Sequence, residues 1–319
     1  MVGAMRSLVL VACALLGVGA CKDKGGTAAG GKPRVAVSIF PLHDVATRVA
    51  GDRLDVVLVL PPGRSEHGYE PTPKEVSKVA GSKLVILAGF AMDEWAHKLV
   101  STASPDVKEL ELGPLCDPRP FTLEHVGEEA AEEAGGDHHE EADEHHHEEG
   151  GMDPHFWLDP VRMQKAVDAM VAAFSGIDPE GAAGYKERGE ATKKALAALN
   201  DELQTHAKGW KKRTIVTFHA SMGYFAERYD LKLAAVIEPF PGREPTAKYM
   251  GEVLAAIKET GAAALFSEPQ LDRAPAKTIA DQAGLPLFEL DPVGGTAGAE
   301  SYEKLLQHDV EVLDKALSQ

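Results

Sequence analysis

Residues 35–60 read VAVSIFPLHDVATRVAGDRLDVVLVL, two short apolar runs that enclose an amphipathic segment. The runs VAVSIF (35–40) and DVVLVL (55–60) are nearly continuous in apolar residues, which is typical of strands buried on both faces. A third run, LVILAG (84–89), lies between the helical patterns TPKEVSKVAGS and MDEWAHKLVSTA. Apolar strands that alternate with amphipathic helices predict a parallel sheet covered on both faces. We therefore expect an α/β lobe that begins near Pro33.

The same pattern returns in the second half of the chain. The strand-like runs there are TIVTFH (214–219), LAAVIEP (233–239), AALFSEP (263–269) and PLFELDP (286–292). A helical stretch follows each run, so we expect a second α/β lobe similar to the first.

Residues 161–208 contain no strand-like run. Apolar residues recur there at helical spacing, at Val167, Met170, Val171, Phe174, Leu196, Leu199 and Leu203. Because Pro179 and Gly181 interrupt the pattern, we predict a shorter helix over 160–176 and a longer one over 180–208. The predicted fold is α/β, with two similar lobes whose parallel sheets are flanked by helices and joined by the long helix. Ligands of open α/β sheets bind beyond the carboxyl ends of the strands, so we expect the site in the cleft between the lobes.

The first twenty residues are typical of an export signal, with Arg6 as the only charged residue before the apolar run LVLVACALL (8–16). The tetrapeptide VGAC, which ends at Cys21, resembles the processing box of bacterial lipoproteins and implies that Cys21 carries a lipid. The polar, glycine-rich residues that follow are typical of a flexible tether. We therefore assign residues 1–20 to a signal peptide and 21–32 to a lipidated tether.

The remaining boundaries follow from the strand and helix patterns. We expect an N-terminal lobe over 33–178, a connecting helix over 179–208 and a C-terminal lobe over 209–319. Cys13 leaves with the signal and Cys21 is acylated, so Cys116 has no partner for a disulfide and is expected to be a small buried side chain.

The chain has 319 residues and a formal net charge of −17 at pH 7. Residues 124–149 contain 12 acidic side chains and no Lys or Arg, so the rest of the chain has a net charge of only −5. An acidic surface repels phosphate groups and anionic lipids, which argues against a nucleic-acid partner.

Five histidines lie within GGDHHEEADEHHHEEGG (135–151), which overlaps this acidic segment. No large apolar residue is present to order it, so we expect the part 124–151 to be a loop. Dense imidazole and carboxylate groups bind divalent cations weakly and in many geometries, although a plain solvated acidic loop is the alternative. The auxiliary, low-affinity metal ligands are predicted to be His138, His139, His145, His146 and His147.

Four further residues with side chains that can bind a metal lie at predicted strand ends and turns. His67 follows DVVLVL through the turn PPGRSE, His219 ends TIVTF, and Asp291 ends LFEL. His155 lies in the turn DPHFWLDP, just before the predicted helices. A lone histidine is more often structural than a ligand, but three histidines that converge with a carboxylate favour a metal site.

The chain resembles the metal-specific solute-binding proteins of ABC importers, the zinc/manganese group known as cluster A-I. The resemblance runs from Pro33 to the end of the chain. The segments that carry it are SEHGYEPTP (65–73), DPHFWLDP (153–160), TFHASMGYFAERYDL (217–231), FSEPQ (266–270) and LDPVGG (290–295).

This resemblance implies an extracytoplasmic receptor that captures Zn²⁺ and hands it to a membrane permease. The family's ligands fall on His67, His155 and His219, with Asp291 at the aspartate position of the last motif. Manganese-selective relatives tend to have a glutamate where this chain has His219. Three imidazoles with one carboxylate or water suit tetrahedral Zn²⁺, and the Irving–Williams order places Mn²⁺ below Zn²⁺ at such a site.

The fourth ligand stays open between Asp291, which we favour, and the alternatives Glu66 and His43. Glu238 or Glu268, at strand ends, could orient the imidazole rings by hydrogen bonding, and a surface or interlobe salt bridge is the alternative for both. We also expect Thr72 to cap the helix that begins near Lys74.

Other functions fit the sequence less well. A hydrolytic zinc enzyme is disfavoured because the chain has no HExxH motif, and a carboxylate ligand would close the position that activated water needs. We therefore expect no enzyme, but a monomeric receptor anchored to the membrane through Cys21. A manganese receptor of the same family, or a surface metal buffer or adhesin with no role in transport, remains the alternative.

Overall fold

The computed structural model describes residues 31–121, 151–239 and 245–318. The predicted signal peptide, Cys21 and nearly all of the predicted tether lie outside the described residues, as do the five predicted auxiliary histidines. From Lys32 onward the chain clusters into one compact unit, which contains both sheets.

The first sheet has four parallel strands in the order β2-β1-β3-β4. These strands are β1 (Arg34–Val37), β2 (Asp55–Leu58), β3 (Ser82–Leu87) and β4 (Lys108–Glu111). The helices α1 (Phe40–Ala50), α2 (Pro73–Val79) and α3 (Glu94–Ala103) connect them. Strand β4 was not predicted, because its residues KELE are mostly charged and largely exposed at the edge of the sheet.

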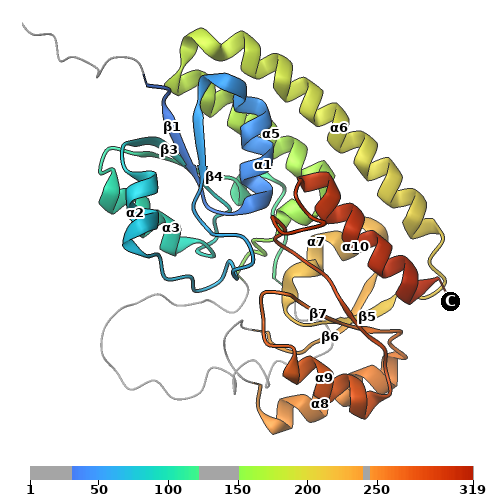
Figure 1. Cartoon of the computed structure of the whole chain (residues 1–319). Helices are drawn as coiled ribbons and strands as arrows, with labels where there is room; N and C mark the ends of the chain where they lie inside the picture. Colours follow the sequence, from blue (N-terminus) through green and yellow to red (C-terminus); the bar gives the residue numbers. More distant parts are fainter. Residues whose placement is uncertain (1–30, 122–150, 240–244, 319) are drawn as a thin grey trace, which may run out of the picture. The chain divides into compact units, whose positions relative to one another are not determined.

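The second sheet repeats this topology, with four parallel strands in the order β6-β5-β7-β8. Its strands are β5 (Thr214–Thr217), β6 (Lys232–Val236), β7 (Leu265–Ser267) and β8 (Leu287–Glu289). Its helices are α7 (Gly223–Tyr229), α8 (Ala247–Thr260), α9 (Ala274–Ala283) and α10 (Tyr302–Leu317). The prediction of two similar parallel sheets flanked by helices is therefore confirmed (Figure 1).

Two helices separate the sheets in sequence, α5 (Pro160–Ile177) and α6 (Ala182–Lys208). The short turn at Pro179–Gly181 lies between them, as the helix-breaking residues predict. Helix α6 is 27 residues long and runs past both sheets (Figure 1). Asp159 caps α5 by accepting a hydrogen bond from the amide of Val161. It also pairs with Arg228 of α7, so the cap ties α5 to the second lobe.

Each sheet has one face in a common core and one face in a core of its own. In β1, Val35 and Val37 belong to the common core, whereas Ala36, which points the other way, packs with residues of α2 and α3. The second sheet divides in the same way, since Ile215 lies in the common core and Val216 packs with α8 and α9.

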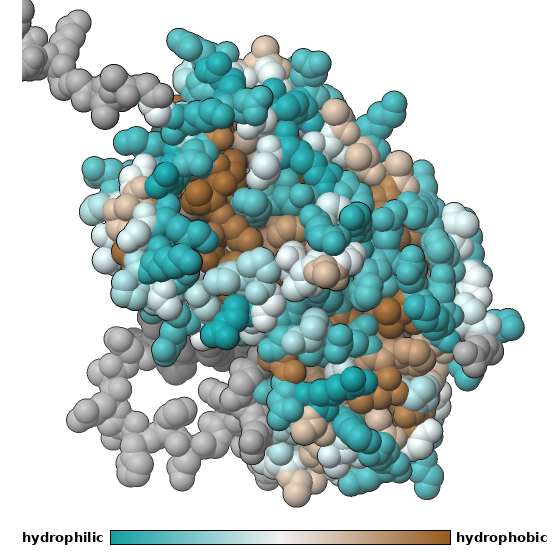
Figure 2. Space-filling view, in the orientation of Figure 1, coloured by the Kyte–Doolittle hydropathy of each residue, from teal (hydrophilic) through white to brown (hydrophobic). Residues whose placement is uncertain are grey.

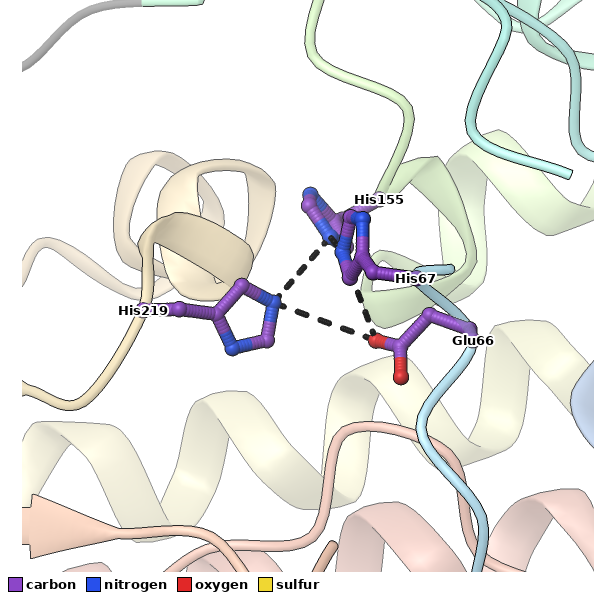
Figure 3. A group of neighbouring side chains, drawn as sticks. All are labelled: Glu66, His67, His155 and His219. Atoms are coloured by element: carbon purple, nitrogen blue, oxygen red, sulfur yellow. Dashed lines mark hydrogen bonds and ion pairs between the residues drawn. The ribbon is translucent and has the colours of Figure 1, made fainter. Parts of the chain in front are cut away.

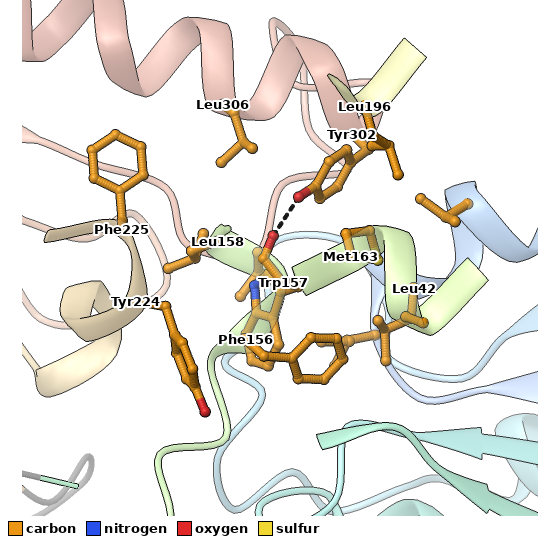
Figure 4. Close-up of a cluster of buried hydrophobic side chains, with 14 of the residues drawn as sticks. Leu42, Phe156, Trp157, Leu158, Met163, Leu196, Tyr224, Phe225, Tyr302 and Leu306 are labelled. Carbon is orange, nitrogen blue, oxygen red and sulfur yellow. Dashed lines mark hydrogen bonds between the residues drawn. The ribbon is translucent and has the colours of Figure 1, made fainter. Parts of the chain in front are cut away.

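The centre of the common core is aromatic (Figure 4). Trp157 is completely buried, and its Nε1 donates to the carbonyl oxygen of Pro292 at 2.7 Å. Tyr302 Oη donates to the carbonyl oxygen of Trp157 at 2.6 Å. Buried aromatic rings with satisfied polar groups give both large apolar area and a fixed geometry. The two lobes therefore share a packed interior.

On the outside, hydrophilic residues cover most of the face in Figure 2, and hydrophobic residues show between them only in limited areas. No helix within the described residues has the length and hydropathy that crossing a bilayer requires. Cys116 is free and completely buried, as expected, and burial raises the pKa of its thiol to about 12.

Candidate metal centre

Four side chains meet where strands of the two sheets end: Glu66, His67, His155 and His219 (Figure 3). Glu66 and His67 come from the loop between β2 and α2, and His219 lies two residues after β5 on the opposite side. His155 precedes the short turn Phe156–Leu158, whose buried residues lock it to the common core. The parallel strands thus deliver ligand-type residues at their carboxyl ends, as open α/β sheets usually do.

The donor atoms are close enough to share one cation. The Nε2 atom of His155 lies 3.3 Å from the Nε2 of His67 and 3.3 Å from the Nε2 of His219. Oxygen Oε1 of Glu66 lies 3.8 Å from the Nε2 atoms of both His67 and His219. In a tetrahedral site with Zn–N bonds of about 2.0–2.1 Å, neighbouring ligand atoms are about 3.3–3.4 Å apart. The two Nε2–Nε2 distances at His155 match that geometry, and the Glu66 oxygen lies about 0.4 Å beyond it.

The ring of His155 is oriented by Asp153. Its Nδ1 lies 2.8 Å from Oδ1 of Asp153, which also accepts the backbone amide of His155 at 3.0 Å. A carboxylate at this position fixes the proton on Nδ1 and leaves the Nε2 lone pair free for a metal. Sequence analysis did not assign this role to Asp153. The signal was present, because a carboxylate two residues before a histidine can reach both its amide and its ring.

The ring of His219 is oriented by Glu268, which follows β7. Its Nδ1 lies 2.7 Å from each of the two carboxylate oxygens of Glu268. Of the two glutamates that the sequence offered for this role, Glu238 and Glu268, the structure brings Glu268 to the ring. Both His155 and His219 are therefore held with Nε2 directed at the shared position.

Glu66, rather than the favoured Asp291, is the carboxylate that joins the three histidines. Asp291 is occupied elsewhere, since its Oδ1 accepts the backbone amides of Val293 and Gly294 at 3.0 and 2.8 Å. The same oxygen accepts a hydrogen bond from Gln270 at 2.6 Å. Asp291 thus shapes the turn after β8. The alternative His43 lies in α1, outside the group of four.

Electrostatics at the group favour a cation. Burial raises the pKa of Glu66. Burial also lowers the pKa of His67 well below its usual value, and the neighbouring rings of His219 and His155 lower it further. Burial acts in the same direction on His219, but the Glu268 carboxylate, together with Glu66, outweighs it and raises the pKa of His219 to about 9. The two glutamates therefore stabilise positive charge at the centre of the group.

Residues 35–316 match the model of the family described as "Zinc-uptake complex component A periplasmic", ZnuA. This chain belongs to the ZnuA family. The family consists of metal-binding solute-binding receptors that work with ABC importer permeases and are not enzymes.

Relatives within and around the ZnuA family differ in the metal that they are named for. The high-affinity zinc uptake system protein ZnuA of Brucella suis biovar 1 is 31% identical over 315 residues, which cover 92% of this chain and 94% of the relative. The manganese-binding lipoprotein MntA of Halalkalibacterium halodurans is 28% identical over 322 residues, 98% of each chain. A crystal structure of ZnuA, 23% identical, covers 90% of this chain with a TM-score of 0.75, which shows the shared fold.

The protein is therefore a periplasmic metal-binding receptor of the ZnuA family. Membership in the family leaves the metal open, because it includes relatives named for zinc and for manganese. The side chains at the site bear on that choice.

Proposed function

We propose that this receptor captures Zn²⁺ and delivers it to the permease of an ABC importer, with Glu66, His67, His155 and His219 as the ligands. The observation that carries the proposal is the set of Nε2 spacings of 3.3 Å, which fits a tetrahedral zinc site. Three imidazoles and one carboxylate also place Zn²⁺ above Mn²⁺ in expected affinity. The zinc-named relative from Brucella supports the same choice.

A manganese receptor is the second candidate, because MntA of Halalkalibacterium halodurans is named as a manganese-binding protein. The nitrogen-rich donor set weighs against it, since Mn²⁺ suits carboxylate, carbonyl and water ligands. A surface buffer or adhesin without a transport role would use the same site, and a metal-uptake assay in cells separates that role from import.

The decisive experiment is a competition titration of the metal-free protein with Zn²⁺ and Mn²⁺, repeated on His219→Glu. We expect one tight Zn²⁺ equivalent in the wild-type protein, with a shift of preference toward Mn²⁺ in the variant because an oxygen ligand replaces a nitrogen. Additional Zn²⁺ equivalents that bind more weakly would be assigned to the proposed auxiliary ligands, which are His138, His139, His145, His146 and His147. Tighter binding of Mn²⁺ than of Zn²⁺ by the wild-type protein would overturn the zinc proposal.

We also propose that the protein is a lipoprotein anchored through Cys21 and that it acts as a monomer outside the cytoplasm. The VGAC box supports the anchor, and MntA of Halalkalibacterium halodurans is named a lipoprotein. We further propose the domain limits inferred from the sequence, with lobes over 33–178 and 209–319 and the connecting helix over 179–208.

A further inference from the structure

Two of the four proposed ligands, Glu66 and His67, are neighbours on one loop, whereas His155 and His219 come from separate segments. His67 is also the accessible member, with 23% of its side chain exposed against 2% for His155 and for His219. Displacement of residues 61–71 would therefore remove two ligands at once and open the buried side of the site.

The imidazole of His67 is held less firmly than the other two. His155 and His219 each have Nδ1 within hydrogen-bond distance of a buried carboxylate, Asp153 or Glu268. Among the described residues, no carboxylate makes such a bond to Nδ1 of His67. Its backbone amide instead bonds locally, to Oγ of Ser65 at 3.2 Å. The position of His67 therefore depends on what holds its loop.

Trp95 holds that loop. Its Nε1 donates to the carbonyl oxygen of Glu66 at 2.9 Å, and its ring packs edge to face with Tyr69, with centroids 5.2 Å apart. Within the described part of the chain, and apart from contacts between the ligand groups, this is the only hydrogen bond from residues 61–71 to another helix or strand. Trp95 itself belongs to α3 and packs against both the common core and the core beside α2 and α3. Tyr69 of the loop also packs against the common core, so Trp95 supplies the loop's hydrogen bond and part of its apolar contact with the rest of the fold.

We infer that Trp95 is the positioning residue that keeps Glu66 and His67 at the metal site, and that metal leaves when this loop separates from Trp95. The inference rests on the proposed function. It assigns the loop 61–71 as the moving part, while His155 and His219 stay fixed by their carboxylates. The rate of metal release then depends on one hydrogen bond and one ring contact of Trp95 as well as on the four ligands.

The test is the rate of Zn²⁺ dissociation from the full-length protein after rapid mixing with excess EDTA, with and without Trp95→Phe. Phenylalanine keeps an aromatic ring near Tyr69 but lacks the N–H donor and one ring of the indole, a loss of volume that the control Trp210→Phe shares. We expect dissociation to become about five- to tenfold faster, as the loss of one hydrogen bond predicts, with the association rate changed less than about twofold. The Co²⁺ absorption spectrum should stay that of the wild-type protein, because all four ligands remain.

The matched control is Trp210→Phe. Trp210 also donates its Nε1 to a partner, Oδ1 of Asp314 at 2.7 Å, but neither residue belongs to the ligand group. We expect wild-type dissociation in this variant. Equal acceleration in both variants, or no acceleration in Trp95→Phe, would overturn the inference.

Hydrogen exchange of the metal-free protein separates this inference from the proposed function. If Trp95 holds the loop, amides of residues 61–71 exchange faster in Trp95→Phe than in the wild-type protein, whatever metal the site prefers. Unchanged exchange in this segment would contradict the positioning role. Failure of the wild-type protein to bind Zn²⁺ tightly would instead overturn the proposed function alone.

Discussion

Glu66 shows at the scale of one residue why the site suits a cation. Only 2% of the residue is exposed, and its Oε1 has no hydrogen-bond partner among the described residues. A buried carboxylate without a partner is strongly unfavourable, whereas a divalent cation shared with three imidazoles would compensate it. Asp291 differs, because its Oδ1 already accepts two backbone amides and a glutamine side chain.

This contrast predicts opposite effects of two substitutions. Glu66→Gln should weaken Zn²⁺ binding by at least about tenfold, since it removes the only charged ligand of the group. Asp291→Ala should leave affinity within about threefold and lower the free energy of unfolding by about 1–3 kcal/mol, because two buried amides lose their acceptor. Titration and urea unfolding of both variants provide the check. A large loss of affinity in Asp291→Ala with none in Glu66→Gln would restore Asp291 as the ligand.

At the scale of single elements, helix α10 carries a buried acid, Asp309, that the metal site does not use. Its Oδ1 accepts the backbone amide of Asp291 at 2.9 Å, and its Oδ2 has no partner within the described residues. Burial raises the pKa of Asp309 well above its usual value. The folded protein therefore keeps a proton on this group at a pH where the unfolded chain has lost it.

The sign of the resulting pH dependence is set by that difference. As the pH rises above the unfolded value of about 3.9, the unfolded state gains stability relative to the folded state, by at most about 1.4 kcal/mol per pH unit until the folded pKa is reached. Asp309→Asn keeps an acceptor for the Asp291 amide and cannot titrate. We therefore expect the variant to become progressively more stable than the wild-type protein between pH 5 and pH 8.

Urea unfolding across this pH range measures the effect. Asp281→Asn is the control, because Asp281 lies on the exposed surface of α9 and pairs with Lys277 in solvent. The small effect of Asp281→Asn on the free energy of unfolding should be the same at pH 5 and at pH 8. A stability difference between Asp309→Asn and the wild-type protein that does not vary with pH would contradict the prediction.

At the scale of the whole molecule, the two lobes are joined by more than a linker. Helix α6 is 27 residues long, and the common core contains residues from both sheets, including Val35 and Ile215. Ion pairs add to this connection, since Arg48 of α1 bonds to Glu303 of α10. A wide hinge motion would have to expose this shared interior, which costs about 25 cal/mol for each Å² of apolar surface.

We therefore expect metal binding to move loops and not whole lobes. Solution scattering of the metal-free and Zn²⁺-loaded protein should give radii of gyration that agree within about 0.5 Å, against about 20 Å expected for a compact body of this length. Compaction by several ångströms on loading would show a wide closure and overturn this view of the fold.

The amino-acid sequence by itself determined the repeated α/β pattern, the long helix and the three histidines that converge. Apolar runs such as residues 35–40 and 214–219 are typical of strands in a parallel sheet that helices cover on both faces. Parallel strands also place their carboxyl ends at the same edge of the sheet. The edge strand β4 was not predicted, because a largely charged and exposed strand lacks the apolar pattern on which the prediction depends.

Only the tertiary structure shows which groups the carboxylates contact. Glu66, Asp153, Glu268 and Asp291 all lie in motifs that the sequence marks as chemical, and residue type does not distinguish a ligand from an orienting group or a turn former. The distinction arises from packing. Asp291 points back to the amides of its own turn, Glu268 and Asp153 reach ring nitrogens, and Glu66 faces three imidazoles. The contact of Trp95 with the loop is also visible only in the tertiary structure, since its hydrogen bond to Glu66 joins residues 29 positions apart.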